Sequence, residues 1–125
     1  MQEYKGSVDI KINLPNGVYD FRAKSATGKT RLAKLLKDYA ADGEPVMSYS
    51  YNDKVNGVPF DSVVHPGKQK LLVLDRYDLY NGEFKEQIEE FAKTGVVLID
   101  IKGPTSIDSE LCYIEMTEDC IEVTE

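Results

Sequence analysis

The chain has 125 residues, which suits one domain with a single core, residues 1–125. It is 42% hydrophobic and 30% charged, as globular proteins are, and no apolar run approaches the ~20 residues that a membrane span needs. The first residues lack the basic-then-apolar order of a signal peptide, so we expect a cytoplasmic protein with no membrane partner.

The net charge of -7 is unevenly distributed along the chain. Basic residues crowd between Arg22 and Lys37, whereas none follows Lys102 and seven acidic residues do. An acidic end of this kind argues against a broad nucleic-acid surface, so a nucleic-acid partner is not expected.

The first elements are two strands joined by a turn. Residues 8–14 alternate apolar and polar side chains, which is typical of a half-buried strand. Pro15-Asn16-Gly17 is a turn signal, and residues 18–22 form a second strand. We therefore expect an antiparallel pair at the start of the chain.

The period then changes to a helical one. Leucines and Tyr39 recur at helical spacing over residues 30–42, and Gly43 marks the end of that helix. Residues 45–51 read as a strand. Residues 52–70 are irregular apart from a short helical turn near Phe60, and a loop of this length is often functional.

The second half contains two continuous apolar runs, residues 71–75 and 96–101, as expected for strands buried on both faces of a sheet. A helix is predicted between them, over residues 82–93. Residues 111–116 and 120–123 are predicted to close the chain as a hairpin. With only two clear helices, one sheet face is thinly covered, so we expect a homo-oligomer or a protein partner there.

One segment carries the clearest chemical signal. Residues 23–30, Ala-Lys-Ser-Ala-Thr-Gly-Lys-Thr, differ from the phosphate-binding pattern G-x-x-x-x-G-K-[ST] only in having Ala23 at the first glycine. Gly28 lets the backbone approach a phosphate, Lys29 supplies a charge for the β- and γ-phosphate oxygens, and Thr30 offers a hydroxyl to Mg²⁺. The segment lies between a predicted strand and a predicted helix, the order that a phosphate site at a helix N-terminus needs.

A second signal is the apolar run that ends at Asp75. A carboxylate at the end of a buried strand lies near such a loop and can hold Mg²⁺. Asp100 and Lys102 end the other apolar strand and are expected at the same sheet edge.

Together these segments resemble a P-loop NTPase, with a degenerate Walker A motif at residues 23–30 and a Walker B motif at residues 71–75. The resemblance implies an α/β fold with a mostly parallel sheet, few helices and antiparallel strands at both chain ends. It also implies that Mg²⁺ and ATP bind, with Thr30 and Asp75 holding the metal and Lys29 stabilising charge during hydrolysis. The residues expected to contact the nucleotide are Ser25, Ala26, Thr27, Gly28, Lys29, Thr30 and Arg31.

The departures from this pattern bear on turnover. Arg76 follows Asp75, where many ATPases have the glutamate that orients water. Asp78 is the candidate replacement as catalytic base, although an exposed carboxylate at a helix start is the simpler interpretation. ATP is favoured over GTP because no guanine-selecting N-K-x-D motif is present.

Two alternatives stay open. In the first, the chain is a pseudo-NTPase scaffold that binds another protein as an inhibitor or adaptor, which Ala23 and the missing glutamate favour. In the second, it is a small kinase-like phosphotransferase, which needs a lid with arginines, and residues 52–70 contain none.

Overall fold

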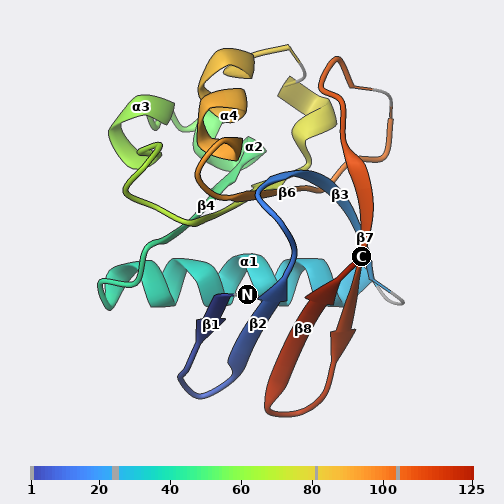
Figure 1. Ribbon diagram of the computed structural model, residues 1–125. Coiled ribbons are helices and arrows are strands. Elements are labelled where there is room, and N and C mark those ends of the chain that lie inside the picture. The colour runs from blue at the N-terminus through green and yellow to red at the C-terminus, as the bar shows by residue number, and fades with distance from the viewer. Residues whose placement is uncertain (1, 24–25, 81, 104) are drawn as a thin grey trace.

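The computed structural model describes residues 2–23, 26–80, 82–103 and 105–125, and for residues 22, 23 and 26–30 it describes the backbone alone. The described strands form one curled sheet in the order β1-β2-β8-β7-β3-β6-β5-β4, with helices on both sides (Figure 1). Of the described helices, none is long and apolar enough to cross a membrane. The elements are β1 (Gln2–Tyr4), β2 (Asp9–Asn13), β3 (Gly17–Ala23), α1 (Ala26–Ala41), β4 (Val46–Ser50), α2 (Tyr51–Val55), α3 (Phe60–Val63), β5 (Leu71–Asp75), the 3-10 helix η1 (Tyr77–Tyr80), α4 (Lys85–Ala92), β6 (Val96–Ile99), β7 (Glu110–Met116) and β8 (Cys120–Thr124).

Five neighbouring strands, β7-β3-β6-β5-β4, run parallel. The two apolar runs form β5 and β6, which lie inside this parallel group. Both are buried as predicted, since residues 71–74 of β5 and all of β6 are fully buried. A parallel strand is covered on both faces, so a continuous apolar sequence is what this position requires.

The antiparallel pair predicted at the start of the chain is wrong. β2 and β3 are both strands, but β8 and β7 lie between them in the sheet. β2 pairs antiparallel with β1 and parallel with β8. The turn at residues 15–17 therefore begins a crossing to another part of the sheet, and Gly17 takes the positive φ of 155° there. The C-terminal hairpin of β7 and β8 is antiparallel, as expected.

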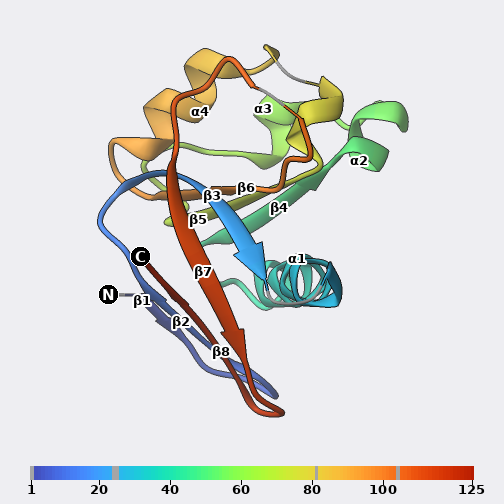
Figure 2. The same cartoon turned by 90° about the vertical axis from the view of Figure 1, so that its right-hand side faces the viewer.

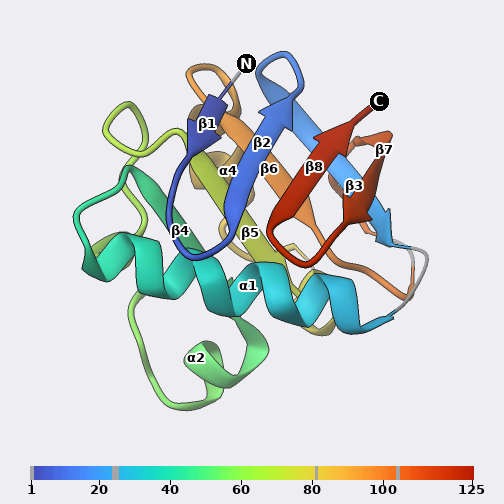
Figure 3. The same ribbon diagram turned by 90° about the horizontal axis from the view of Figure 1, so that it is seen from below.

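The sheet curls around α1, so that strands pack against this helix from two sides. One core cluster joins the inner faces of β1, β2 and β8 to Leu32, Leu36 and Tyr39 of α1 and to the central strands. The Tyr39 hydroxyl donates to the Val8 carbonyl, which ties the helix to the N-terminal segment. Figure 3 shows β1, β2 and β8 side by side next to α1.

The opposite face of the parallel strands is better covered than the sequence predicts. α3, η1 and α4 pack on it around Tyr49, Phe60 and Phe91 in a second core cluster. The helical turn near Phe60 is confirmed as α3. α2 was not predicted, although the pattern Ser50-x-x-Asp53 that caps it is a known helix start signal. Among the described elements, no helix covers the outer faces of β1, β2, β8 and β7 (Figure 2).

Candidate functional site at the carboxyl edge of the parallel strands

The predicted phosphate loop joins β3 to α1. β3 ends at Ala23 and α1 begins at Ala26, four residues before the predicted start at Thr30. The N-terminal end of α1 therefore lies beside the carboxyl ends of the parallel strands (Figure 2). In open α/β sheets, ligands bind at this edge.

The residues predicted to contact a nucleotide divide into three groups. Ser25 lies outside the described residues. Ala26 through Thr30, including Gly28 and Lys29, have a helical backbone, and their side chains are not described. Arg31 is placed away from the loop, because its guanidinium donates to the Glu118 carbonyl oxygen at 3.1 Å.

The helical backbone over residues 26–30 changes how amide groups can meet a phosphate. The first amides of a helix have no acceptor within the helix, and the helix dipole adds partial positive charge at that end. An anion placed there would meet the amides of the first turn of the helix.

Three polar residues from adjacent strands form a row at the same edge. Ser50 of β4 pairs in register with Asp75 of β5. Leu74 pairs with Ile99, and the Asp100 amide donates to the Leu74 carbonyl at 2.9 Å, so Asp100 follows next to Asp75. Side chains alternate along these strands, which places this row on the face that α1 covers. Asp100 therefore lies at the predicted edge.

The two carboxyl groups interact directly. Burial raises the pKa of Asp75 above its usual range, and a hydrogen bond with the Asp100 carboxyl and its charge raise it further. The charges of Arg76 and Lys37 act in the opposite direction. Two carboxyls this close favour a shared proton or a shared cation.

Lys37 connects this row to α2. Its ammonium lies 3.2 Å from a carboxylate oxygen of Asp53. Asp53 in turn accepts from the Ser50 amide at 2.8 Å and completes the capping box of α2. Sequence reasoning missed Lys37 and Asp53, although the capping pattern was available to find Asp53.

Arg76 turns sharply away from the end of β5. Its φ of 52° lies in the left-handed region, which is uncommon for any residue other than glycine. The next residue is anchored, since the Tyr77 amide donates to the Asp100 carbonyl at 2.8 Å. This turn brings the Arg76 guanidinium onto Asp78, with Nε–Oδ1 at 3.2 Å and Nη2–Oδ2 at 3.1 Å.

Asp78, the predicted base, is therefore an ion-pair partner at the start of η1. Its hydrogen bonds from Arg76 hold its pKa below the usual range, and the Lys102 backbone amide acts in the same direction. A carboxylate with a lowered pKa is a weaker proton acceptor, which makes general-base catalysis by Asp78 less effective.

The described side chains offer two carboxylates for a cation, those of Asp75 and Asp100. Within the described part of the chain, no three His, Cys, Asp or Glu side chains gather as a metal-binding group. Two carboxylates with the remaining positions filled by water and phosphate oxygens suit Mg²⁺, which keeps much of its hydration in proteins.

Comparisons of the chain with protein-family models, with curated proteins and with solved structures found no match.

Proposed function

We propose that this protein binds a nucleoside triphosphate, ATP in preference to GTP, together with Mg²⁺. One observation carries the proposal: the segment resembling a Walker A motif joins β3 to α1 at the edge where Asp75 and Asp100 interact. A phosphate site and a cation site at one sheet edge are what a magnesium–triphosphate complex requires.

The residue roles in this proposal follow the resemblance. Lys29 supplies charge to the β- and γ-phosphates, and Thr30 with Asp75 holds the metal. Asp100 adds a second carboxylate on the metal side. Bound Mg²⁺ would neutralise charge on the triphosphate.

Turnover in this proposal is slow or depends on a partner. The supporting observation is the Arg76–Asp78 ion pair, which engages the carboxylate that the sequence predicts as the catalytic base. The same observation favours the second candidate function, a pseudo-NTPase scaffold that acts by binding another protein.

The first test is thermal unfolding with and without Mg²⁺-ATP and Mg²⁺-GTP. A ligand at a hundred times its Kd adds about 2.7 kcal/mol to the free energy of unfolding. For a domain of this size that is a rise in Tm on the order of 10 °C. We expect the rise with ATP to disappear in Lys29→Ala and to lose its Mg²⁺ dependence in Asp75→Asn.

Lys68→Ala is the matched control, because Lys68 is an exposed lysine in the loop before β5. It removes the same charge and should leave the rise in Tm unchanged. No rise with either nucleotide at millimolar concentration, or an equal loss in Lys68→Ala, would contradict nucleotide binding at this site and favour the scaffold function.

A further inference from the structure

The carboxyl ends of β6, β5 and β4 are held together by η1. The Tyr77 amide donates to the carbonyl of Asp100, the residue after β6. The Tyr80 hydroxyl donates to the Asp75 carbonyl of β5 and to the Tyr49 carbonyl of β4, both at 3.3 Å. These three strands lead into the row of polar residues at the candidate site. One short helix therefore contacts the backbone of all three strand ends.

The Tyr80 hydroxyl donates where the strand ladder stops. A hydroxyl has one proton, so two acceptors at equal distance share it in a three-centre hydrogen bond. Ser50 and Asp75 are the last register pair of β4 and β5, and α2 begins at Tyr51. Burial and the charge of Asp75 raise the pKa of Tyr80, so this hydroxyl stays protonated and keeps donating.

The ring of Tyr80 is fixed by contacts that do not involve its hydroxyl. It packs edge-on against the rings of Tyr77, Tyr49 and Phe84, with centroids 5.2, 6.0 and 6.4 Å away. Tyr80 belongs to the second core cluster, whereas the side chain of Asp75 lies on the face that α1 covers. Tyr80 therefore acts on the carboxyl pair through the backbone of the strand ends.

We propose that Tyr80 is a positioning residue for Mg²⁺, an inference that rests on the function proposed above. Its hydroxyl holds the backbone of Asp75 so that the carboxyl group stays beside that of Asp100. The end of a strand opens more readily than its centre, and a left-handed turn at Arg76 follows directly. Mg²⁺ demands near-octahedral ligands at about 2.1 Å, so a small displacement of one carboxylate lowers the affinity for the metal.

The test variant is Tyr80→Phe, which removes the hydroxyl and keeps the packed ring. We expect the Kd for Mg²⁺ to rise about 10-fold, as it does when a group that orients a metal ligand is lost. The measurement is an NMR titration of the full chain with Mg²⁺ alone, which follows the side-chain carboxyl signals of Asp75 and Asp100. In Tyr80→Phe these signals should already be shifted before the metal is added.

A second readout separates positioning from a general loss of structure. The affinity for ATP in the presence of EDTA should be the same in Tyr80→Phe and in the wild type, because the phosphates are assigned to Lys29 and the first turn of α1. Damage to the whole sheet edge would weaken ATP binding and Mg²⁺ binding together.

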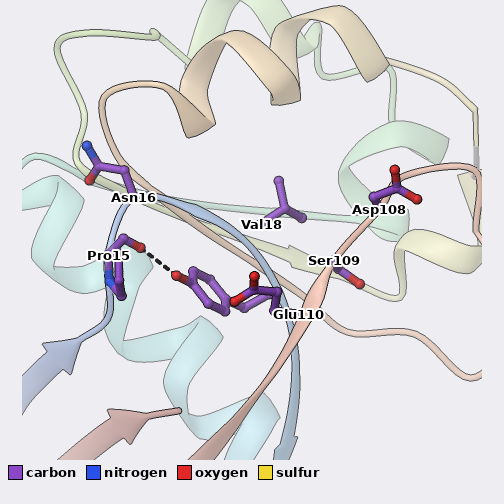
Figure 4. A pocket seen from close by; sticks show the side chains of 7 residues that line it. Pro15, Asn16, Val18, Asp108, Ser109 and Glu110 are labelled. Carbon is purple, nitrogen blue, oxygen red and sulfur yellow. Dashed lines mark hydrogen bonds between the residues drawn. The ribbon is translucent and has the colours of Figure 1, made fainter.

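Two other tyrosines provide matched controls. Tyr77→Phe removes a hydroxyl from the same short helix, one that donates to the Glu83 carbonyl at 3.0 Å, and it keeps the backbone amide. Tyr19→Phe removes a hydroxyl near the start of β3, far from the carboxyl ends. That hydroxyl donates to the Pro15 carbonyl at 2.8 Å beside a hollow in the surface, as the dashed line in Figure 4 marks. Both controls should bind Mg²⁺ with the Kd of the wild type.

An unchanged Kd for Mg²⁺ in Tyr80→Phe would overturn the proposal, and so would an equal loss in either control. If Tyr80→Phe does not fold, the wild type decides: Mg²⁺ should move the ring signals of Tyr80 and leave those of Tyr19 in place, and unmoved Tyr80 signals would overturn the proposal. A wild type that binds ATP without Mg²⁺ would exclude the positioning role and keep nucleotide binding. A wild type that binds neither would exclude both.

Discussion

Arg76 stores backbone strain at the point where β5 ends. A left-handed conformation costs a residue with a β-carbon roughly 1–2 kcal/mol, and glycine escapes that cost. Two contacts hold the turn in place: the Asp78 carboxylate accepts from the Arg76 guanidinium, and the Tyr77 amide donates to the Asp100 carbonyl. Strain of this kind is concentrated at functional sites, which agrees with the position of Arg76 beside the Asp75–Asp100 pair.

A pair of substitutions isolates this strain. Arg76→Gly and Arg76→Ala both remove the ion pair with Asp78, but only glycine relieves the positive φ. We therefore expect Arg76→Gly to be more stable than Arg76→Ala by about 1 kcal/mol, with urea unfolding as the measurement. Equal free energies of unfolding would show that the turn is unstrained.

The two cysteines differ in environment, and their reactivity should differ accordingly. Burial and the nearby charge of Asp20 raise the pKa of Cys112 to about 12, whereas Cys120 is partly exposed. At pH 8 the native Cys112 thiol is protonated and shielded. A thiol reagent should then modify one cysteine rapidly and the second only on unfolding, and Cys120→Ser should abolish the rapid phase.

The raised pKa of Cys112 also has a consequence for stability at high pH. The unfolded chain loses this proton near pH 9, and the folded chain holds it to about pH 12. The contribution to stability is therefore complete below pH 9 and is lost as the pH rises toward 12. A Cys112→Ala variant should show a smaller fall in Tm over that range, and an unchanged fall would contradict this assignment.

At the scale of elements, the junction between α4 and β6 is a tight point where Gly95 meets the backbone of another element without a positive φ. A β-carbon on Gly95 would lie 2.8 Å from the Lys70 carbonyl oxygen and 2.8 Å from the Phe91 ring. The Lys70 carbonyl cannot move freely, because it accepts from the Val96 amide at 2.9 Å.

Gly95→Ala should therefore destabilise the fold by roughly 1–3 kcal/mol, as overpacking does. Gly103→Ala is the matched control, since a β-carbon there meets nothing within 4 Å. The control should be neutral or slightly stabilising. Urea midpoints of the two variants give the comparison, and a neutral Gly95→Ala would mean that the β5–β6 edge yields easily.

Sequence patterns located most elements because buried positions require apolar residues, and the spacing of those residues indicates the type of element. β5 and β6 are continuous apolar runs, and β7 and β8 alternate around a short turn. The sequence of a strand says less about which other strand it pairs with. Residues 8–14 and 18–22 read as adjacent strands, yet β2 pairs with β1 and β8, and β3 pairs with β6 and β7. Local alternation therefore identified the strands and gave the wrong pairing.

For the candidate site, the sequence likewise predicted the position of residues but not all of their contacts. Strand ends placed Asp75 and Asp100 at one edge, because parallel strands end together. The Arg76–Asp78 and Lys37–Asp53 pairs depend on a left-handed turn and on the angle at which α1 crosses the sheet. Neither is encoded in residue spacing, so the environment of Asp78 became clear only from the structure.

The whole molecule is organised around α1. The helix has the central parallel strands on one side and the inner faces of β1, β2 and β8 on the other, joined in one core cluster. Both parts of the curled sheet therefore pack against the same helix. A nucleotide at the N-terminal end of α1 would contact the element that both parts share. Ligand binding there would stabilise the fold as a unit.

β8 lies between β2 and β7 as an interior strand, although it follows every other described element along the sequence. During synthesis, β1 and β2 are made before the other described strands and have no partner in the rest of the sheet until residues 120–124 emerge from the ribosome. Until then Ile10 and Ile12, which are fully buried in the finished fold, lack β8 on one side. Nascent chains that stall before residue 120 should consequently be recognised by chaperones or degraded.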